Sequence, residues 1–276
     1  MGLPHEITVR KIKFEFPAEL DAIDVVQGHP EESLFNVALS LLLPYLEPYL
    51  IRSLNAAKQE TTDPGLIADI DAFNAQEGQH YRQHKIFNDL VRGRYQGLEP
   101  FEEELAQDYR RFTETKSLRF NLAYAEGFEA YTSAMALFSF EEGMVERFHP
   151  VAKDLFMWHL VEELEHRTVA FDVYDQVVGG YFYRLFVGLY AQWHMSQWIL
   201  RVANYLGAAE EKRFLDQWGG VKGRRARLLP VFWLMVRRLL PKVLKTYLPW
   251  YSPSRIRIPD SVKTLWAQYS ARASSS

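Results

Sequence analysis

The sequence contains no cysteine among its 276 residues. This absence excludes a disulfide framework, a cysteine-ligated zinc or iron–sulfur site and a thiol nucleophile. Any metal site must therefore be built from histidine, aspartate and glutamate. Glycine and proline are also few, with 15 and 13 residues, and 48% of the chain is apolar. Such a composition excludes a disordered, collagenous or low-complexity chain and predicts one large globular domain or two small ones.

Long uncharged apolar runs are missing as well. The first residues, MGLPHEITVRKIKFEF, lack the apolar stretch of a signal peptide. The longest segment without a charged residue, 185–200, includes Gln192, His194, Ser196 and Gln197. It is too short and too polar to predict a membrane span. We therefore expect a cytoplasmic protein, with membrane association left open by the charge distribution.

Positive charge is concentrated in one segment. Residues 221–250 contain eight Lys and Arg and no Asp or Glu, which leaves 24 basic against 35 acidic residues in the rest of the chain. A basic helix with apolar residues such as Trp233 can bind an anionic membrane surface; the alternative is a helix packed on the protein with a solvated basic face. Nucleic-acid binding is not expected, because the remaining chain is acidic and no recognition motif is present.

Helical patterns dominate after a short alternating segment. Ile12, Phe14 and Phe16 alternate with charged residues and predict an extended N-terminal arm or a lone strand. Helices are predicted at the following approximate ranges: 32–55, 63–92, from 100, 117–142, 150–179, 181–206, 208–217 and 223–249, the last broken at Pro230 and Pro241. The expected fold is all-α, with an arm over 1–30, a four-helix bundle over 31–180 and further helices over 181–276 packed on the bundle, in one structural domain.

Four glutamates occupy apolar helical segments where a surface charge is not expected. They are Glu47, Glu77, Glu129 and Glu163. Burial of an unpaired carboxylate is costly, so each should pair with a cation or bind one. His80 follows Glu77 by three residues, and His166 follows Glu163 by the same spacing. In a helix this spacing places both side chains on one face, about one turn apart.

Two Glu-x-x-His helices and two helices with one Glu each form the ligand pattern of dinuclear carboxylate sites in four-helix bundles. The intervals from Glu47 to Glu77 and from Glu129 to Glu163 each suit one helix, a turn and a return. A single Glu-x-x-His is common and usually binds no metal, so the prediction rests on the combination. Histidine and carboxylate ligands without thiolate predict two metal ions, with iron expected and manganese or zinc as alternatives.

Two further histidines share these helix faces. His84 lies seven residues after Glu77, and His159 lies four before Glu163. Each is expected either to bind metal directly or to orient a ligand through a hydrogen bond.

Two assignments have a competitor on the same helix. Glu126 competes with Glu129, and Glu162 competes with Glu163. Glu129 is preferred for the helix-length interval to Glu163, and Glu163 for its spacing to His166.

Four stretches resemble a bacterial family described as predicted metal-dependent hydrolases, over about 7–243. They are ALSLLLPYLEPYLIRS (38–53), QExxHxxxH (76–84), GFEAYTSA (127–134) and HLVEELEHRTVAFDVY (159–174). The bundle pattern resembles ferritin-like di-iron carboxylate proteins, and the His-x-x-x-Glu-x-x-His of 159–166 resembles di-iron arylamine N-oxygenases. The chain departs from the family pattern at Ala130, where His is typical, and at Gln83, where Glu is typical. Both departures leave the eight predicted metal residues intact.

The resemblance implies a metal-dependent enzyme, and two reactions follow from it. The first is activation of dioxygen to oxidise a small hydrophobic or aromatic substrate, with an electron donor as partner. The alternative is metal-dependent hydrolysis at the same site. No acid or nucleophile outside the metal residues stands out, so no other catalytic residue is assigned. The aromatic residues of 181–206 are expected to form core, a homodimer surface or a substrate channel.

Overall fold

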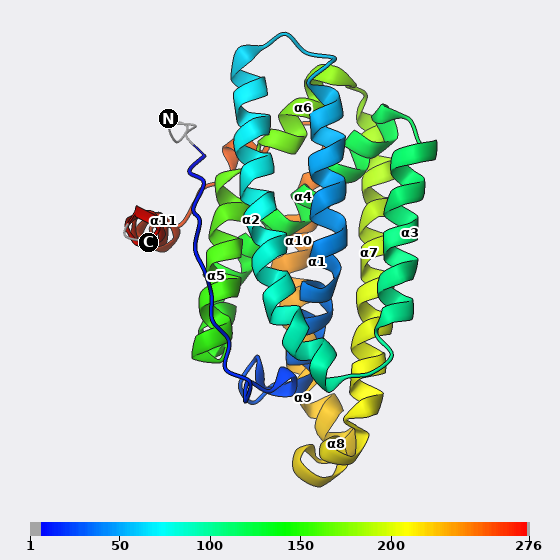
Figure 1. Cartoon of the computed structure of the whole chain (residues 1–276), viewed down its shortest axis with the longest axis vertical. Helices are drawn as coiled ribbons and strands as arrows, with labels where there is room; N and C mark the ends of the chain where they lie inside the picture. Colours follow the sequence, from blue (N-terminus) through cyan, green and yellow to red (C-terminus); the bar gives the residue numbers. More distant parts are fainter. Residues whose placement is uncertain (1–6, 275–276) are drawn as a thin grey trace.

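The computed structural model describes residues 7–274, and this part of the chain is helical almost throughout (Figure 1). It contains no strand within these residues, and one isolated β-bridge joins Val26 and Phe148. The all-α prediction is therefore confirmed. The N-terminal arm is extended but unpaired: the Phe14 amide donates to Gln83 of the second helix, and its ring packs on Trp158 of the fifth.

Four helices pack around a common centre. They are α1 (Pro30–Ala57), α2 (Pro64–Arg94), α4 (Leu118–Glu141) and α5 (Pro150–Glu165). α1 packs on α2 and α4, and α5 packs on α4 and α2, which closes a four-helix ring. The predicted N-terminal caps of α2 and α4 are present. Asp63 accepts from the Gly65 and Leu66 amides, and Ser117 accepts from the Phe120 amide.

More than half of the residues of α1 are buried. The helix also contacts α3 (Glu99–Thr115) and α7 (Tyr181–Ala209) on the outside of the ring. Pro44 and Pro48 lie within α1, as the sequence indicated. Among the described helices, α1 alone is long and apolar enough to cross a membrane, yet 61% of its most apolar window is buried in the protein. That burial is typical of the core helix of a bundle.

The predicted helix over 150–179 is interrupted, so the prediction of a continuous helix there was wrong. α5 ends before His166, and α6 (Val169–Val177) begins three residues later. The Arg167 guanidinium lies at the break and donates to the carbonyls of Leu164 and Pro253. The bond to Leu164 satisfies a carbonyl that the end of α5 leaves without an intrahelical partner. One of the acceptors lies 86 positions away, so no local pattern predicts the break.

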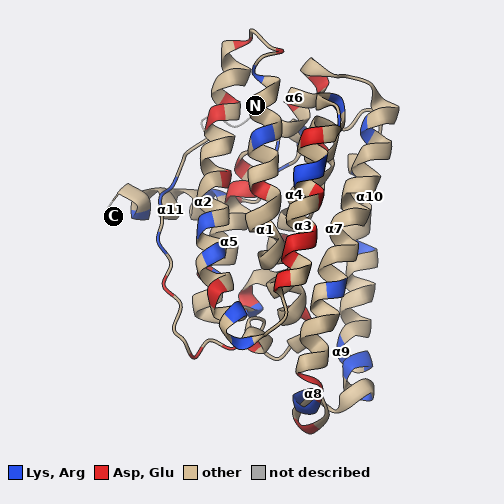
Figure 2. Ribbon diagram, turned by 45° about the vertical axis from the view of Figure 1, so that its right-hand side comes forward, with Lys and Arg blue, Asp and Glu red and all other residues tan. Residues whose placement is uncertain are grey.

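The C-terminal helices pack on the ring from outside (Figure 2). They comprise α7, α8 (Glu211–Trp218), α9 (Gly220–Leu234), α10 (Leu240–Thr246) and α11 (Asp260–Ser274). α7 packs on α4 and α1, α10 on α4, and α11 on α5. Two predicted breaks were wrong, because Gly207 lies inside α7 and Pro230 inside α9. The break before Pro241 is instead a π-helical turn over 235–239.

α4 and α7 approach closely at a pair of glycines, Gly127 and Gly188. A Cβ added to Gly127 would lie 2.3 Å from the Cα of Gly188. Backbone atoms occupy that space, so neither a rotamer change nor a side-chain shift could make room. Glycine at this position therefore sets the distance between the ring and α7.

We predict that Gly127→Ala destabilises the protein by about 1–3 kcal/mol, because it forces the two helix backbones apart. Gly93→Ala in α2 is the matched control, since no atom lies within 4 Å of its added Cβ. It should leave stability unchanged or raise it by up to about 1 kcal/mol. Urea unfolding followed by circular dichroism measures both, and equal stability of the two variants would contradict the close packing.

Candidate metal centre

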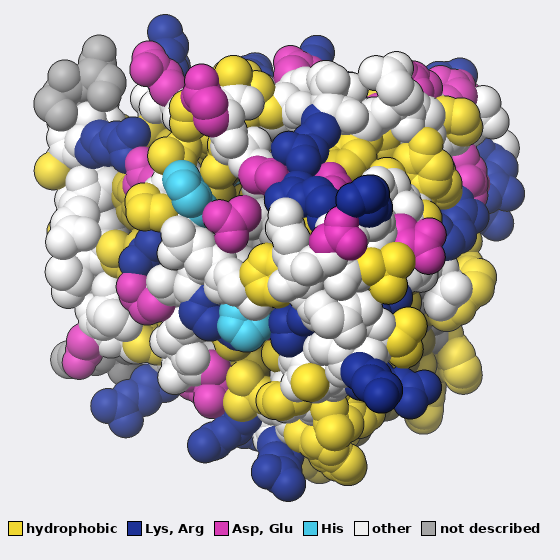
Figure 3. All heavy atoms as spheres, turned by 90° about the horizontal axis from the view of Figure 1, so that it is seen from below, with side chains coloured by type: hydrophobic (Ala, Val, Ile, Leu, Met, Phe, Trp, Pro, Cys, Tyr) yellow, Lys and Arg dark blue, Asp and Glu magenta, His cyan; other side chains and the backbone are white. Residues whose placement is uncertain are grey.

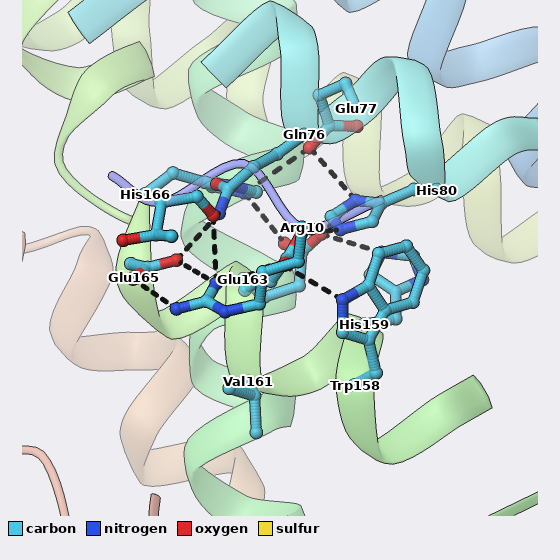
Figure 4. A network of polar contacts seen from close by, with 12 residues as sticks. Arg10, Gln76, Glu77, His80, Trp158, His159, Val161, Glu163, Glu165 and His166 are labelled. Atoms are coloured by element: carbon cyan, nitrogen blue, oxygen red, sulfur yellow. Dashed lines mark hydrogen bonds and ion pairs between the residues drawn. The ribbon is translucent and has the colours of Figure 1, made fainter. Parts of the chain in front are cut away.

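Seven of the eight predicted residues converge at the centre of the ring. They are Glu47 from α1, Glu77 and His80 from α2, Glu129 from α4, His159 and Glu163 from α5, and His166 just beyond α5. All are buried, with at most 9% of their surface exposed. Figure 4 shows five of them together with their hydrogen-bond partners. The eighth residue, His84, lies next to the cluster and contacts it through His159, with 2.8 Å between His84 Nε2 and His159 Nδ1.

The converging side chains form two groups with metal-ligand geometry. Glu47, His80 and His159 make one group, and Glu77, Glu163 and His166 make the other, with the donor atoms of each group within 4.8 Å of one another. Glu163 Oε1 also lies 2.8 Å from His159 Nε2, and Glu77 Oε1 lies 3.5 Å from His80 Nδ1. Glu77 and Glu163 therefore stand between the two groups.

Glu129 completes the second group. Its Oε2 lies 3.3 Å from the Nε2 of His166, which is also near Glu77 and Glu163. Its competitor Glu126 instead accepts a hydrogen bond from Arg184 of α7, at 2.7 Å. Glu126 is thus paired, whereas both oxygens of Glu129 lack a hydrogen-bond partner.

Nine buried atoms of this cluster have no hydrogen-bond partner. They are both oxygens of Glu47, Glu77 and Glu129, Oε2 of Glu163, Nδ1 of His80 and Nε2 of His166. Buried polar atoms are nearly always satisfied, and an unpaired buried carboxylate is especially costly. Oxygen and nitrogen donors left unsatisfied at one point are what a pair of bound cations requires. The residues present therefore fit a dinuclear metal site.

The protonation states reflect this crowding of acids. Burial and the charges of Glu77, Glu163 and Glu129 raise the pKa of Glu47 well above its ordinary value. Burial, followed by the charge of Glu163, raises the pKa of Glu129 to about 8. Such a concentration of raised carboxyl pKa values indicates that, without a cation, the site holds protons in its place.

At Glu163 and His80, neighbouring charged groups outweigh burial and favour the charged form. Burial disfavours the charged form of Glu163, but His166 and His159 outweigh it and hold its pKa well below the usual range. Burial also disfavours the charged form of His80, but its bonds to Glu162 and Glu77 raise its pKa to about 9. Protons in the centre therefore sit on histidine as well as on glutamate.

The orientation of His80 is set by Glu162. Its Nε2 lies 3.0 Å from Glu162 Oε2, and this carboxylate also accepts from Trp158 Nε1 and from the Arg10 guanidinium. The carboxylate acts as the acceptor, so Nε2 carries a proton, and Nδ1 faces the centre, where it would give up its own proton to bind a metal. Glu162 thus orients a histidine, as carboxylates beside metal-bound histidines do.

Gln76 holds His166 in the same manner. Its amide nitrogen donates to the Thr8 carbonyl and to Glu165, which fixes the amide so that Oε1 faces His166 Nδ1 at 2.9 Å. His166 therefore donates through Nδ1 and presents Nε2 to the centre. Arg10 pairs with Glu165 as well as with Glu162, so the N-terminal arm supports both histidines.

A chain of hydrogen bonds through His84 holds His159. Asn88 donates to the Ser40 carbonyl, and the Ser40 hydroxyl donates to the Asn88 side-chain oxygen. Ser40 Oγ must then accept from His84 Nδ1, at 2.8 Å, which leaves His84 Nε2 to accept from His159 Nδ1, also at 2.8 Å. His159 consequently presents Nε2 to the centre. His84 has both nitrogens engaged in this chain and supports His159 through a hydrogen bond.

The sequence analysis missed the residues that hold the histidines. They are Arg10, Ser40, Gln76, Asn88, Trp158 and Glu165. One signal was available, because the EELE run of 162–165 contains more acids than two metal groups need. The additional acids required a cation from elsewhere, and Arg10 supplies it from 152 positions away.

A family model described as a predicted metal-dependent hydrolase matches residues 8–256. The chain belongs to this family. The match includes every converging residue together with Arg10, so the centre lies within the family's shared region. No match was found among curated proteins or among solved structures.

In this member of the family of predicted metal-dependent hydrolases, a cavity of about 600 Å³ reaches the centre. His84, His159 and Glu163 form its inner end. Its walls are mostly apolar side chains from α1, α4 and α7, among them Leu39, Phe128 and Ile199. A cavity of this volume and lining is typical of a small-molecule site.

We predict that the metal-free protein loses stability as the pH rises from 7 to 9. The folded state keeps protons on Glu129 and His80, with pKa values of about 8 and 9, whereas the unfolded chain has released them near 4.5 and 6.5. Stability present at low pH is therefore lost as the pH passes through the folded values, by up to about 1.4 kcal/mol per pH unit for each proton.

Urea unfolding in excess chelator, repeated at several pH values, measures this dependence. His84 and His159, whose pKa values are lowered by burial, act in the opposite direction but only below about pH 7. Protein saturated with a divalent metal should show a much flatter profile. A metal-free protein whose stability is constant or rises between pH 7 and 9 would contradict the assigned proton positions.

Proposed function

We propose that this chain is a dinuclear metal-dependent enzyme that acts on an apolar small molecule. The observation that carries the proposal is the cluster of nine buried, unsatisfied donor atoms at the inner end of an apolar cavity. Family membership supports metal dependence, and the cavity supports a substrate rather than a structural role.

The residues divide naturally between two ions. Glu47, His80 and His159 would hold the first, and Glu129 and His166 the second. Glu77 and Glu163, which lie between the groups, would bridge them. Four carboxylates would offset the four positive charges of two divalent ions, so the loaded centre would be close to neutral in its buried setting.

The donor set suits iron, manganese or zinc, and we expect iron. When bound, the ions would supply Lewis acidity and a water of lowered pKa, or, with iron, electrons for the reduction of dioxygen. The chain's own part is to fix the ligands through Glu162, Gln76 and His84, and to hold an apolar substrate beside Glu163 and His159.

Hydrolysis is the reaction that the family description supports. Oxidation by dioxygen is the second candidate, because four of the seven converging side chains are carboxylates inside a helical bundle and the cavity is apolar. That argument is an analogy between folds. An oxidative reaction would also need an electron donor from outside the chain.

We predict that the protein binds two metal ions per chain and that Glu129→Gln reduces this to one or none. Glu126→Gln is the matched control, because it changes the same residue type one turn earlier on α4, where Glu126 pairs with Arg184. The control should keep two ions. Metal analysis after equilibration with iron or zinc measures both variants, and equal metal contents in the two would contradict the assignment.

The two reactions are separated by their need for oxygen. Protein loaded with zinc, manganese or iron is incubated anaerobically with nitrophenyl esters of increasing acyl length. Ester cleavage that depends on the metal and increases with chain length supports hydrolysis. Turnover seen only with iron, air and a reductant, measured as oxygen uptake, would support oxidation and contradict hydrolysis.

A further inference from the structure

Large apolar side chains are exposed on one part of the molecule. Fourteen of the fifteen in the described chain lie between residues 182 and 250, and Ile86 is the exception. Phe182, Phe186 and Trp193 of α7 are 71%, 69% and 57% exposed. Their spacings of four and seven residues place them on one helix face, opposite the buried residues that contact the ring. So large an exposed apolar area marks a binding surface.

α9 and α10 continue this surface. α9 is fifteen residues long, and none of them is buried. Val221, Phe232 and Trp233 are about half to two-thirds exposed. In Figure 2 both helices lie beside α7 along one side of the molecule, and Figure 3 shows yellow apolar side chains gathered there with blue basic ones around them. We call the exposed part of 182–250 the α7–α10 surface.

The eight basic residues of 221–250 fall into two sets. Three pair with acids of the ring or its loops, namely Arg227 with Glu31, Arg238 with Glu142 and Lys242 with Glu141. The other five are exposed and form no ion pair within the described residues: Lys222, Arg224, Arg225, Arg237 and Lys245. No acid occurs in 221–250, so these five charges are left for a partner that is both anionic and apolar.

An anionic lipid bilayer satisfies both demands. Its head groups attract Lys and Arg, and its interfacial region accepts Trp and Phe side chains. A second copy of the chain would cover the apolar residues, but a symmetric dimer would place the five unpaired cations against one another. Nucleic acid would match the charge but leave the exposed Phe and Trp side chains without an apolar partner.

The cavity that reaches the metal centre opens on the same surface. Leu200, Leu215, Val221 and Arg224 line the cavity and are also exposed. Its other end is formed by His159 and Glu163. A molecule that enters between α7 and α9 can therefore pass from the α7–α10 surface to the centre through apolar walls.

We propose that the α7–α10 surface binds an anionic bilayer, and that the cavity draws an amphiphile with a single apolar chain from that bilayer to the metal centre. The second half rests on the proposed function, whereas bilayer binding stands on the surface alone. Because the rest of the chain is acidic, an anionic bilayer attracts only this side and orients the cavity opening toward the lipid.

Flotation with vesicles tests whether the α7–α10 surface binds an anionic bilayer. We expect binding to phosphatidylcholine vesicles that contain phosphatidylglycerol, little binding to pure phosphatidylcholine, and loss of binding in high salt. The triple variant K222Q/R224Q/R225Q should partition roughly 100-fold more weakly, because each basic residue at such a surface contributes about fivefold. The matched control K11Q/K13Q/K85Q removes the same charge from exposed positions on the arm and α2 and should bind like the wild type.

Three outcomes would overturn bilayer binding. The first is no binding of the wild type to anionic vesicles, and the second is equal loss in the triple variant and its control. The third is a stable dimer in lipid-free solution, seen by sedimentation, that dissociates on Phe186→Ser and does not bind vesicles. Metal content is measured on every sample, so loss of the centre is distinguishable from loss of the surface.

A fluorescent acyl probe tests whether the cavity takes up an amphiphile with a single apolar chain. Dansyl-labelled undecanoic acid should bind the wild type in a one-to-one complex, and Ala203→Trp, which fills the cavity from α7, should weaken binding at least tenfold. Ala209→Trp is the matched control, since Ala209 is exposed on the same helix and does not line the cavity. Both should bind vesicles and metal normally. Unchanged probe binding by Ala203→Trp would overturn the proposed route.

Discussion

Four buried carboxylates at one level of a helical bundle are the constraint on which the rest of this structure depends. Glu47, Glu77, Glu129 and Glu163 repel one another when ionised, because burial separates them from the solvent that would screen their charges. Such a cluster is tolerable only with protons or cations among the carboxylates. Three histidines share the space, and each has one nitrogen aimed at the cluster and the other held from behind.

The three supports of the histidines come from different parts of the chain. His80 depends on Glu162 of α5, His166 on Gln76 of α2, and His159 on His84 and the residues behind it. Arg10 ties two of these supports together from the extended arm. The arm therefore has a structural reason to lie along α2 and α5, because it neutralises acids that orient ligands without entering the centre itself.

The sequence predicted what local periodicity determines. The Glu-x-x-His spacing, the caps at Asp63 and Ser117 and the all-α class follow from positions a few residues apart. It did not predict the break after α5 or the role of Glu162, because both depend on residues about 86 and 152 positions away, Pro253 and Arg10. Preference for Glu129 over Glu126 followed from helix length, while Arg184, which pairs with Glu126, could not be foreseen.

The central proposal is that two metal ions would bind in this cluster, with Glu77 and Glu163 placed between them. The most direct test is anomalous diffraction from crystals of metal-loaded protein, recorded on both sides of the absorption edge of the metal. The account predicts two anomalous peaks, one near His80 and His159 and the other near His166, with the two bridging carboxylates between them. A map with no peak within the ring, or with metal bound only at surface residues, would contradict it.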